Sequence, residues 1–334
     1  MRTDRNDGEQ WTTLTVSPKD SGEELLRFLS VRFVTTSKTA LRRLMASGRI
    51  RVEGSAAEPS QLLRPGETIS VPPDLSFSAL PEQTLPINVL HEDEAHLCVD
   101  KPAGHPVLPG RRGEGAEFYE SLLAMLNREA PQGGPYVRPH LVHRLDRETS
   151  GVLLVAKSDR AGRALGRQFE RHQVEKEYLG IIEGVLPRPE LRLDIPLRRM
   201  PGSLLKMEAA PAGGKPASSV VRIKERFGHF ALLEIRPLTG RQHQIRVHLA
   251  ATGHPLAVDH LYGRREELRG AGLNAILGRD VAAARAVLLA RCPLHAASIR
   301  YRHPGTGEPM EQRSPLPADL AWFVEILREA DPHD

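Results

Sequence analysis

The sequence predicts an α+β protein in which a mostly antiparallel mixed sheet is flanked by helices. Two observations lead to this prediction. Hairpin patterns dominate residues 87–328, for example the apolar runs 220–227 and 230–235 on either side of a Gly-His turn. Helical patterns, with apolar residues three or four positions apart, stand between the hairpins and after the last of them. Strands joined by tight turns pair antiparallel, and helices cover the apolar face of the sheet.

The composition is that of an ordinary soluble globular protein. The 334 residues are enough for two domains, with 40% hydrophobic and 26% charged residues. The net charge of +4 is small, but a pI of about 9.2 favours an acidic partner such as nucleic acid. The predicted organisation is a flexible N-terminus, a small domain, a linker and a large domain, at residues 1–21, 22–73, 74–86 and 87–328.

Cysteine usage and hydropathy narrow the class of protein further. Cys98 and Cys292 stand far apart without a C-x-x-C pattern, which indicates neither a disulfide framework nor a zinc site. The first residues are polar and unlike a signal peptide, and no apolar stretch reaches the ~18 residues of a transmembrane helix. We therefore expect a cytoplasmic protein without a membrane partner, and we expect a monomer.

The small domain combines two helices with short strands. Apolar residues from Leu25 onward predict the first helix, and Ser37 is a favourable N-cap for the second. Alternating apolar residues at 50–52 and 68–71 predict two strands.

Cations without any acid mark the second of these helices and the turn after it. They are Lys38, Arg42, Arg43, Arg49 and Arg51. Lys38 and Arg42 are one helical turn apart and share a face, which suits a phosphate backbone. The alternative is an ordinary solvated helix face. The order of helices, strands and turns over residues 22–73 resembles the α-L RNA-binding module of ribosomal proteins, and this resemblance implies RNA binding.

The large domain is expected to alternate strands and helices up to a terminal helix at 320–327. Two segments stand apart: residues 187–217 are predicted to be surface loops, and residues 264–290 an Ala/Arg-rich helical insertion. The other expected elements, in order, are a hairpin at 87–99, a helix at 116–128, a strand ending at 146, a buried strand at 152–155, a helix at 158–169, a strand at 178–182, a hairpin at 220–235, a helix near 241–249 and closing strands from 294.

The sequence His143-Arg-Leu-Asp-Arg-Glu-Thr-Ser-Gly151 is the central motif of this domain. It places one carboxylate, Asp146, between Arg144 and Arg147 and just before a buried strand. Burying charged groups costs free energy, so charged residues next to a buried strand suggest a functional site. From these residues alone, a solvated hairpin tip is the alternative to a functional site.

This motif closely resembles the signature of the RluA-type pseudouridine synthases, which isomerise uridine to pseudouridine in RNA. The resemblance extends over residues 22–328. It implies that Asp146 is the catalytic residue. It also implies that the α+β fold carries a mostly antiparallel sheet, as the hairpins indicate.

Further motifs continue the resemblance. Lys101 begins a Lys-Pro-x-Gly element, and Tyr178 ends a Lys-x-Tyr element. Residues 240–248, Gly-Arg-Gln-His-Gln-Ile-Arg-Val-His, form the last motif. The spacing of Ile245 and Leu249 predicts a helix whose first turn holds Arg241. The resemblance implies that Arg241 lies against the catalytic Asp and that Ile245 is an apolar wall of the site. Tyr178 would stack on the base or steer a proton, although a tyrosine on a strand is more often part of the core.

The expected reaction needs an ionised carboxylate near the anomeric carbon but no redox cofactor. Asp146 could act as a nucleophile on the sugar or as a base at the ribose, and the sequence leaves both open. No metal is predicted, because His140 and His143 are three residues apart and would point to opposite faces of a strand. His143 is expected to order the loop, while Arg144 and Arg147 would bind phosphates and Lys101 would contribute to the RNA site.

The predicted function is pseudouridine formation in RNA without a cofactor, most simply in large-subunit ribosomal RNA, with transfer RNA as the alternative. The target uridine must be flipped out of its stack, which costs a few kcal/mol. Two other functions compete with this prediction. An RNA-binding assembly protein that has lost catalysis should have lost Asp146 or Arg241, and both are present. A glycosidase would want a second carboxylate, which no motif supplies.

Overall fold

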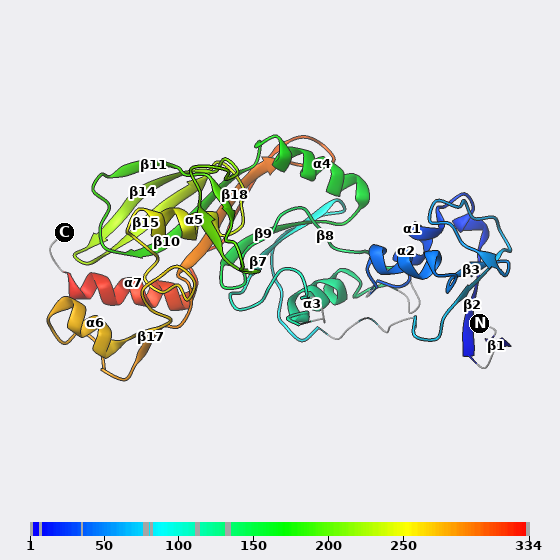
Figure 1. Ribbon diagram of the computed structural model, residues 1–334, viewed down its shortest axis with the longest axis horizontal. Coiled ribbons are helices and arrows are strands. Elements are labelled where there is room, and N and C mark those ends of the chain that lie inside the picture. The colour runs from blue at the N-terminus through cyan, green and yellow to red at the C-terminus, as the bar shows by residue number, and fades with distance from the viewer. Residues whose placement is uncertain are drawn as a thin grey trace. The chain divides into compact units, whose positions relative to one another are not determined.

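The chain folds into two compact units, which are described separately (Figure 1). One contains Met1–Thr84 and Glu120–Pro139, the other Leu85–Tyr119 and His140–Asp334. The first unit thus takes in residues 120–139, which were predicted to belong to the large domain. The structure is a computed structural model that describes residues 3–6, 9–34, 36–75, 80, 83–110, 114–130 and 135–331. The predicted linker lies partly outside these described residues.

The first unit is built on a five-stranded sheet with the order β1-β2-β5-β3-β4. Its elements are β1 (Thr3–Asn6), β2 (Glu9–Thr15), a 3-10 helix (Pro18–Asp20), α1 (Leu25–Ser30), α2 (Lys38–Ala46), β3 (Arg51–Val52), β4 (Ser55–Ala56), β5 (Thr68–Val71) and most of α3 (Glu117–Leu126). The sequence indicated a flexible stretch at residues 1–21, whereas residues 12–15 of β2 pair with β5 and Val16 is buried.

The two helices of this unit form for the reasons the sequence indicated. The Ser37 side chain accepts a hydrogen bond from the backbone N–H of Ala40 and caps α2. Leu41 and Met45, one turn apart, are buried in the core with Phe28 of α1. Leu44 is partly buried against the same core, whereas the cations Arg42 and Arg43 of α2 are exposed.

The second unit is organised around a mixed sheet with the order β11-β14-β15-β10-β18-β9-β7-β6. Among the strand pairs that the structure describes, only β9 and β18 run parallel. This confirms the predicted mostly antiparallel sheet. The strands are β6 (Asn88–Glu92), β7 (His96–Lys101), β9 (Ser150–Ala156), β10 (Glu175–Glu183), β11 (Glu190–Asp194), β14 (Ser218–Phe227), β15 (Phe230–Pro237) and β18 (Leu294–Arg302), with β8 (His140–Leu141) paired to β9 and β19 (Pro309–Arg313) paired to β18.

Helices cover both faces of this sheet because successive strand residues point to opposite sides. Ile181 of β10 packs in a cluster with α6 (Gly270–Leu277) and α7 (Ala318–Ala330), which lie together on one side of the strands in Figure 1. Its neighbour Ile182 packs with α5 (Gln244–Ala251) on the opposite face. The helix α4 (Asp159–Glu170) is capped by Ser158 and covers β9. Tyr178 belongs to the α5 face.

Two segments differ from their predicted form. Residues 187–217, expected to be surface loops, contain β11 and a two-stranded sheet of β12 (Leu197–Arg199) and β13 (Met207–Ala209). Residues 264–290, expected to be helical, contain α6 and a small sheet of β16 (Leu268–Arg269) and β17 (Val287–Leu289). Leu268, Leu273 and Leu288 bury this segment in the core beside α7. No described helix is long and apolar enough to cross a membrane.

The parallel contact between β9 and β18 depends on Gly151, the last residue of the central motif. Gly151 has φ +112°, and a Cβ on it would lie 2.2 Å from the carbonyl oxygen of Ala296. Only glycine allows the two strands to approach this closely. The motif therefore ends in a residue that fixes how the loop before it enters the sheet.

Candidate active site

Asp146 lies on an irregular segment between β8 and β9. The sequence predicted a strand that ends at this residue, but β8 already ends at Leu141. The side chain of Leu145 is buried and anchors the segment, and the backbone N–H of Thr149 donates to the carbonyl oxygen of Asp146 at 3.1 Å. The carboxylate of Asp146 keeps about a fifth of its surface exposed, at 19%.

Lys101 is buried and stabilises this segment through hydrogen bonds, and it does not contact RNA as predicted. The residue is fully buried, and its ammonium donates to the carbonyl oxygens of Pro102 (2.6 Å), His105 (2.7 Å) and Arg147 (3.2 Å). Burial, assisted by the positive charge of Arg291, lowers the pKa of Lys101 to about 7. The sequence assignment of Lys101 to the RNA-contacting surface is corrected: its position is that of a structural support for the Asp146 loop.

Two further interactions fix the chain after Asp146. Arg147 and Gly104 exchange hydrogen bonds, with the Gly104 N–H on the Arg147 carbonyl at 2.9 Å and the Arg147 Nε on the Gly104 carbonyl at 3.1 Å. The carboxylate of Glu148 accepts from the backbone N–H of Cys292 at 3.0 Å. Arg147 itself is exposed. Hydrogen bonds therefore join the predicted Lys-Pro-x-Gly element to the central motif.

A pocket of about 560 Å³ opens over Asp146. This volume is in the range of pockets that hold one small molecule. The residues around it come from the central motif, from β10 and from the segment that leads into α5. They include Val142, His143, Arg144, Leu145, Asp146, Phe169, Glu170, Lys176, Tyr178, Leu238, Thr239, Arg241, His243, Gln244, Ile245 and Arg246.

Arg246, not Arg241, is the guanidinium that faces Asp146. Its Nη1 lies 3.6 Å from Oδ2 of Asp146, while Nε and Nη2 make two hydrogen bonds of 2.7 Å to the carboxylate of Asp259. Arg246 is 5% exposed and Asp259 2% exposed. The two carboxylates raise the pKa of Arg246 despite its burial, so its charge is permanent.

Arg241 lies at the edge of the pocket. It precedes α5, which begins at Gln244, and the prediction that it stands in the first helical turn is wrong. Its side chain is exposed, and its Nε donates to the carbonyl oxygen of Pro216 at 3.1 Å. The predicted contact between Arg241 and Asp146 is replaced by the contact between Arg246 and Asp146.

His243 approaches Asp146 from the other side and was not singled out by the sequence. Its backbone has φ +54° at the N-cap of α5, a left-handed conformation that turns the side chain into the pocket. Nε2 lies 3.9 Å from Oδ1 of Asp146, and Nδ1 lies 2.7 Å from the hydroxyl of Tyr262. That hydroxyl accepts from the N–H of Met207 at 2.8 Å. Burial lowers the pKa of His243, and the charge of Asp146 opposes this shift.

A buried polar chain fixes the start of α5. The amide of Gln244 accepts from the Arg241 N–H at 3.0 Å and donates to the hydroxyl of Ser219 at 2.9 Å. The Ser219 hydroxyl lies 3.1 Å from Nδ1 of His248, and Nε2 of His248 lies 3.0 Å from the carbonyl oxygen of Ile195. All members of this chain are satisfied, so the helix that carries Arg246 is held rigidly.

Tyr178, Lys176 and Ile245 form the wall of the pocket beside Asp146. Ile245 is 6% exposed and presents an apolar surface, in the position that the sequence predicted. Burial and the neighbouring charge of Asp146 raise the pKa of Tyr178, so its hydroxyl keeps its proton. Burial also lowers the pKa of Lys176.

His143 and Arg144 are neighbours in sequence but differ in their surroundings. The ring of His143 stacks on Phe169 with centroids 4.8 Å apart, and its Nε2 accepts from the backbone N–H of Leu154 at 2.9 Å. Burial and the charge of Lys176 lower the pKa of His143 to about 3. His143 is thus a neutral residue that orders the loop. Arg144 is exposed at the pocket.

Known proteins share both the sequence and the fold. The model of the RNA pseudouridylate synthase family matches residues 95–251, which include Asp146, Tyr178 and Arg246. Ribosomal large subunit pseudouridine synthase C of Yersinia pestis is 32% identical over 95% of this chain and 95% of its own length. Ribosomal large subunit pseudouridine synthase D of Xanthomonas campestris is 36% identical over 92% of this chain and 90% of its own.

The chain belongs to the RNA pseudouridylate synthase family. The resemblance to the RluA-type enzymes is confirmed, and with it the prediction of an RNA pseudouridine synthase, an isomerase. A solved structure described as human RNA pseudouridylate synthase domain containing 4 is 26% identical, with a TM-score of 0.56 over 72% of this chain and 93% of its own.

The cations predicted to bind RNA in the first unit lie on α2, on the turn after it and at the start of β3. Arg42 and Arg43 are exposed on α2, and Lys38 begins the helix. Arg49 pairs with Asp74 at 2.8 Å. Arg51 lies over the ring of Trp11, with its guanidinium carbon 5.1 Å from the ring centroid. Exposed cations on one element are what phosphate binding needs, and the use of these residues remains a prediction.

Arg246 and His243 were not predicted from the sequence, although both stand in the last motif. Six of the nine residues of that motif are polar, at positions 241–244, 246 and 248, so the pattern itself does not show which one is buried. A usable signal was the later Asp259, because a buried arginine needs a buried acid. Asp259 also accepts from the N–H groups of Leu261 and Tyr262, which fixes its orientation toward Arg246.

Proposed function

We propose that this chain converts one or a few uridines of large-subunit ribosomal RNA to pseudouridine, with Asp146 as the catalytic carboxylate and without a cofactor. The observation that carries the proposal is the position of Asp146. Its carboxylate lines a nucleoside-sized pocket and faces a buried, permanently charged guanidinium, whereas the other carboxylate at the pocket, that of Glu170, is exposed. The guanidinium offsets the negative charge of the carboxylate form, which is the form that acts as a nucleophile or a base.

The reaction moves a bond without exchanging electrons. The bond between N1 of uracil and C1′ of the ribose breaks, a bond between C5 and C1′ forms, C5 loses its hydrogen as a proton, and N1 gains a proton. In the proposal Asp146 acts at the ribose, either by attack on C1′ or as a base that removes a proton from the sugar. Arg246 holds the carboxylate in place and offsets its charge.

Other pocket residues have proposed roles in binding. The hydroxyl of Tyr178 is protonated beside Asp146, so it can donate to the detached base or move a proton. Ile245 supplies the apolar surface against which the base turns. Arg144 and Arg241 are exposed at the pocket and suit the phosphates on either side of a flipped nucleotide. Arg147, exposed on the same loop, is a further candidate for the backbone.

The proposed substrate rests on the relatives. Two of the similar proteins are named as synthases of the large ribosomal subunit, and each aligns over at least nine tenths of both chains. We propose that the first unit acts as an α-L-type RNA-binding domain through Lys38, Arg42, Arg43, Arg49 and Arg51. We place the reaction in the cytoplasm, where bacterial ribosomal RNA is found, and we propose a monomeric enzyme.

The role of the first unit can be tested by the salt dependence of RNA binding. We compare the double variant Arg42→Gln/Arg43→Gln with Arg27→Gln, in which the lost cation is one already paired with Glu23 on the same unit. Each phosphate contact contributes about −0.7 to −0.9 to the slope of log affinity against log salt concentration. The double variant should lose up to two such contacts and Arg27→Gln none. Equal slopes for all three proteins would contradict an RNA-binding role for α2.

The function itself is tested by mapping pseudouridine in total RNA from cells with the gene intact, deleted, and restored as wild type or as Asp146→Asn. The proposal predicts that deletion removes one or a few sites in large-subunit ribosomal RNA, and that only the wild-type gene restores them. Loss of sites in transfer RNA instead would keep the activity and overturn the substrate. No change at any site would contradict the proposal.

A further inference from the structure

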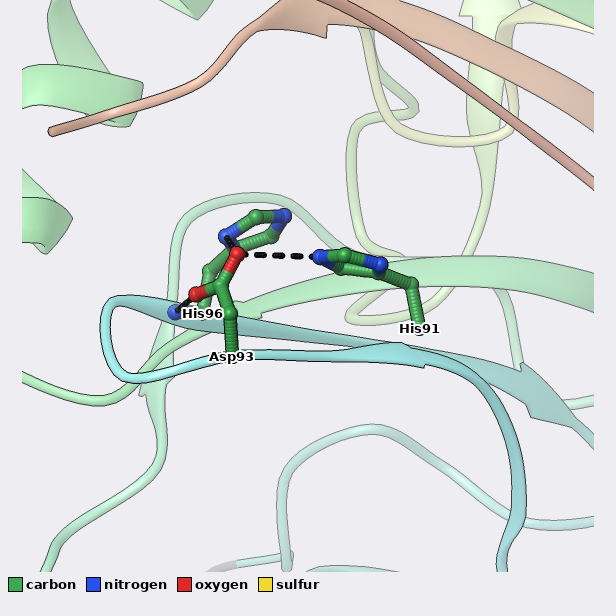
Figure 2. Close-up of side chains that lie close together, drawn as sticks. All are labelled: His91, Asp93 and His96. Carbon is green, nitrogen blue, oxygen red and sulfur yellow. Dashed lines mark hydrogen bonds and ion pairs between the residues drawn. The ribbon is translucent and has the colours of Figure 1, made fainter. Parts of the chain in front are cut away.

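The turn between β6 and β7 brings two histidines and an aspartate together outside the pocket. Nε2 of His91 lies 2.9 Å and Nδ1 of His96 lies 3.0 Å from Oδ2 of Asp93. The potential ligand atoms of these three residues all lie within 4.8 Å of one another. Figure 2 shows the three side chains pointing toward one another from the two ends of the turn. None of them lines the pocket over Asp146.

The turn itself aims the carboxylate of Asp93 at the two rings. Oδ1 accepts hydrogen bonds from the backbone N–H groups of Ala95 at 2.7 Å and His96 at 2.9 Å. The ammonium of Lys157 donates to the Asp93 carbonyl oxygen at 2.7 Å. These bonds occupy one carboxylate oxygen and leave the other, Oδ2, directed at the histidines.

His96 has a buried ring nitrogen without a partner, which points to a ligand. The residue is fully buried, and its Nε2 lies 2.6 Å from the hydroxyl of Tyr301. Its Nδ1 has no hydrogen-bond partner among the described residues, although the carboxylate oxygen of Asp93 is only 3.0 Å away. A ring that carries its proton on Nε2 presents the lone pair of Nδ1 toward this oxygen, and a cation held between the two atoms would bind both. In that form the bond from Nε2 to Tyr301 is the outer-shell contact that metal-ligating histidines usually make.

His303 completes the surroundings but is not a ligand. Its Nδ1 accepts from the backbone N–H groups of Gly305 at 3.1 Å and Thr306 at 2.9 Å. A ring that accepts at Nδ1 carries its proton on Nε2, so His303 donates to Oδ2 of Asp93 at 3.0 Å. This bond comes from the turn between β18 and β19 and orients the carboxylate from outside, as outer-shell partners do.

We propose that His91, Asp93 and His96 bind a divalent first-row transition-metal ion, with zinc as the best-fitting probe. Two imidazole nitrogens and one carboxylate oxygen suit Zn²⁺ and Co²⁺ better than Mg²⁺ or Ca²⁺, which prefer sites made of oxygen. Tetrahedral zinc at ordinary bond lengths places its ligand atoms about 3.3 Å apart, a few tenths of an ångström more than the nitrogen–oxygen distances in the turn.

Water can reach the proposed ion. The side chains of His91 and Asp93 are 28% and 29% exposed, whereas that of His96 is fully buried. The buried side chain of His96 fixes the geometry of the site. The partly exposed side chains of His91 and Asp93 leave a path by which the ion can enter and room for water molecules that complete its coordination. The ion would join β6 to β7 beside the contact from His303, so its expected role is to stabilise this corner of the second unit.

The test uses the full chain without an affinity tag, freed of metals with a chelator. Isothermal titration with Zn²⁺, and absorption in the visible region with Co²⁺, measure affinity, stoichiometry and coordination. We expect one ion per chain and the visible bands of a four- or five-coordinate cobalt site. His91→Ala and Asp93→Asn should each weaken binding at least about tenfold, and His303→Ala about tenfold, as for other outer-shell partners.

The variants are chosen so that loss of binding does not require loss of fold. The amide introduced by Asp93→Asn keeps an oxygen that can accept from the N–H groups of Ala95 and His96, and His91 is partly exposed. Circular dichroism should therefore show native folding for both variants. His229→Ala removes an exposed histidine at the β14–β15 turn and serves as the matched control with unchanged binding. Failure of the wild-type chain to bind one ion, or equal binding by His91→Ala, Asp93→Asn and wild type, would overturn the proposal.

Discussion

Nη1 of Arg246 lies 3.6 Å from Oδ2 of Asp146, while the other two nitrogens of the same guanidinium are bound to Asp259. One buried cation thus serves two carboxylates, of which Asp259 is sealed in the core and Asp146 faces the pocket. The bidentate bond to Asp259 fixes the guanidinium, and the guanidinium fixes the position of Asp146. Of the two arginines in the last motif, Arg246 therefore positions Asp146, whereas Arg241 lies exposed at the edge of the pocket.

Arg246→Gln should impair both stability and activity. The substitution leaves Asp259 as a buried charge without its partner, which typically costs about 3–5 kcal/mol. Urea unfolding measures this loss, and single-turnover pseudouridine formation measures the activity, which we expect to fall by at least about a hundredfold. The double variant Arg246→Gln/Asp259→Asn should recover part of the stability but not the activity. Full activity in Arg246→Gln would show that Asp146 does not depend on this contact.

Arg241→Gln should affect RNA binding and leave the chemical step intact. Arg241 is exposed and its side chain contacts only the Pro216 carbonyl among the hydrogen bonds described, so its removal disturbs no buried charge. We expect the salt slope of RNA binding to become shallower by about one contact, with the rate at saturating RNA unchanged. Arg226→Gln, an exposed cation of β14 outside the pocket, is the control. A collapse of the rate in Arg241→Gln would restore the role that the sequence first indicated.

Tyr178→Phe removes the protonated hydroxyl beside Asp146 and keeps the ring. Positioned proton donors contribute about 10²–10⁴-fold to rates, so we expect the rate constant at saturating RNA to fall by at least about a hundredfold with KM nearly unchanged. Tyr178→Leu, which also loses the ring, should raise KM in addition. Wild-type rates for Tyr178→Phe would restrict Tyr178 to a stacking role.

Because the pKa of His143 is lowered in the folded protein, this residue should reduce the free energy of unfolding as the pH falls. Its folded pKa of about 3 lies below the ordinary histidine value of 6.5, so the unfolded chain binds more protons between these values. The stability linked to this residue is therefore complete above pH 6.5 and is lost as the pH falls toward 3. Between about pH 7.5 and 5.5, His143→Gln should lose about 1.4 kcal/mol less free energy of unfolding than the wild type. Equal losses by urea unfolding would show that His143 is not buried in its neutral form.

Local sequence patterns predicted much of the fold. Ser37 caps the helix that it was expected to cap, and the runs around Gly228 form the expected hairpin. These features depend on residues within one turn or one hairpin. The N-terminal strand β2 was missed although it pairs with the neighbouring β1; its other partner, β5, lies more than fifty residues away in sequence, so no local pattern shows that pairing.

Only part of the candidate site was predicted, because only some of its contacts are between residues close in sequence. The motif around Asp146 is contiguous, so its position at a pocket followed from the resemblance. The choice between Arg241 and Arg246 depends on Asp259 and on the start of α5, which no local pattern gives. The burial of Lys101 was not predicted because it depends in part on the carbonyl oxygen of Arg147, which is distant in sequence. The cluster at His91 was missed because a shift of register after Val89 breaks the alternation of β6.

The measurement that tests the central claim most directly is tritium release from large-subunit ribosomal RNA labelled at C5 of uridine. Formation of the C5–C1′ bond expels this hydrogen, so release reports the reaction itself. Purified wild-type protein should release the label from one or a few uridines per RNA. Asp146→Asn should bind the same RNA with similar affinity and release none. Release by Asp146→Asn at the wild-type rate would contradict the assignment of Asp146 as the catalytic carboxylate.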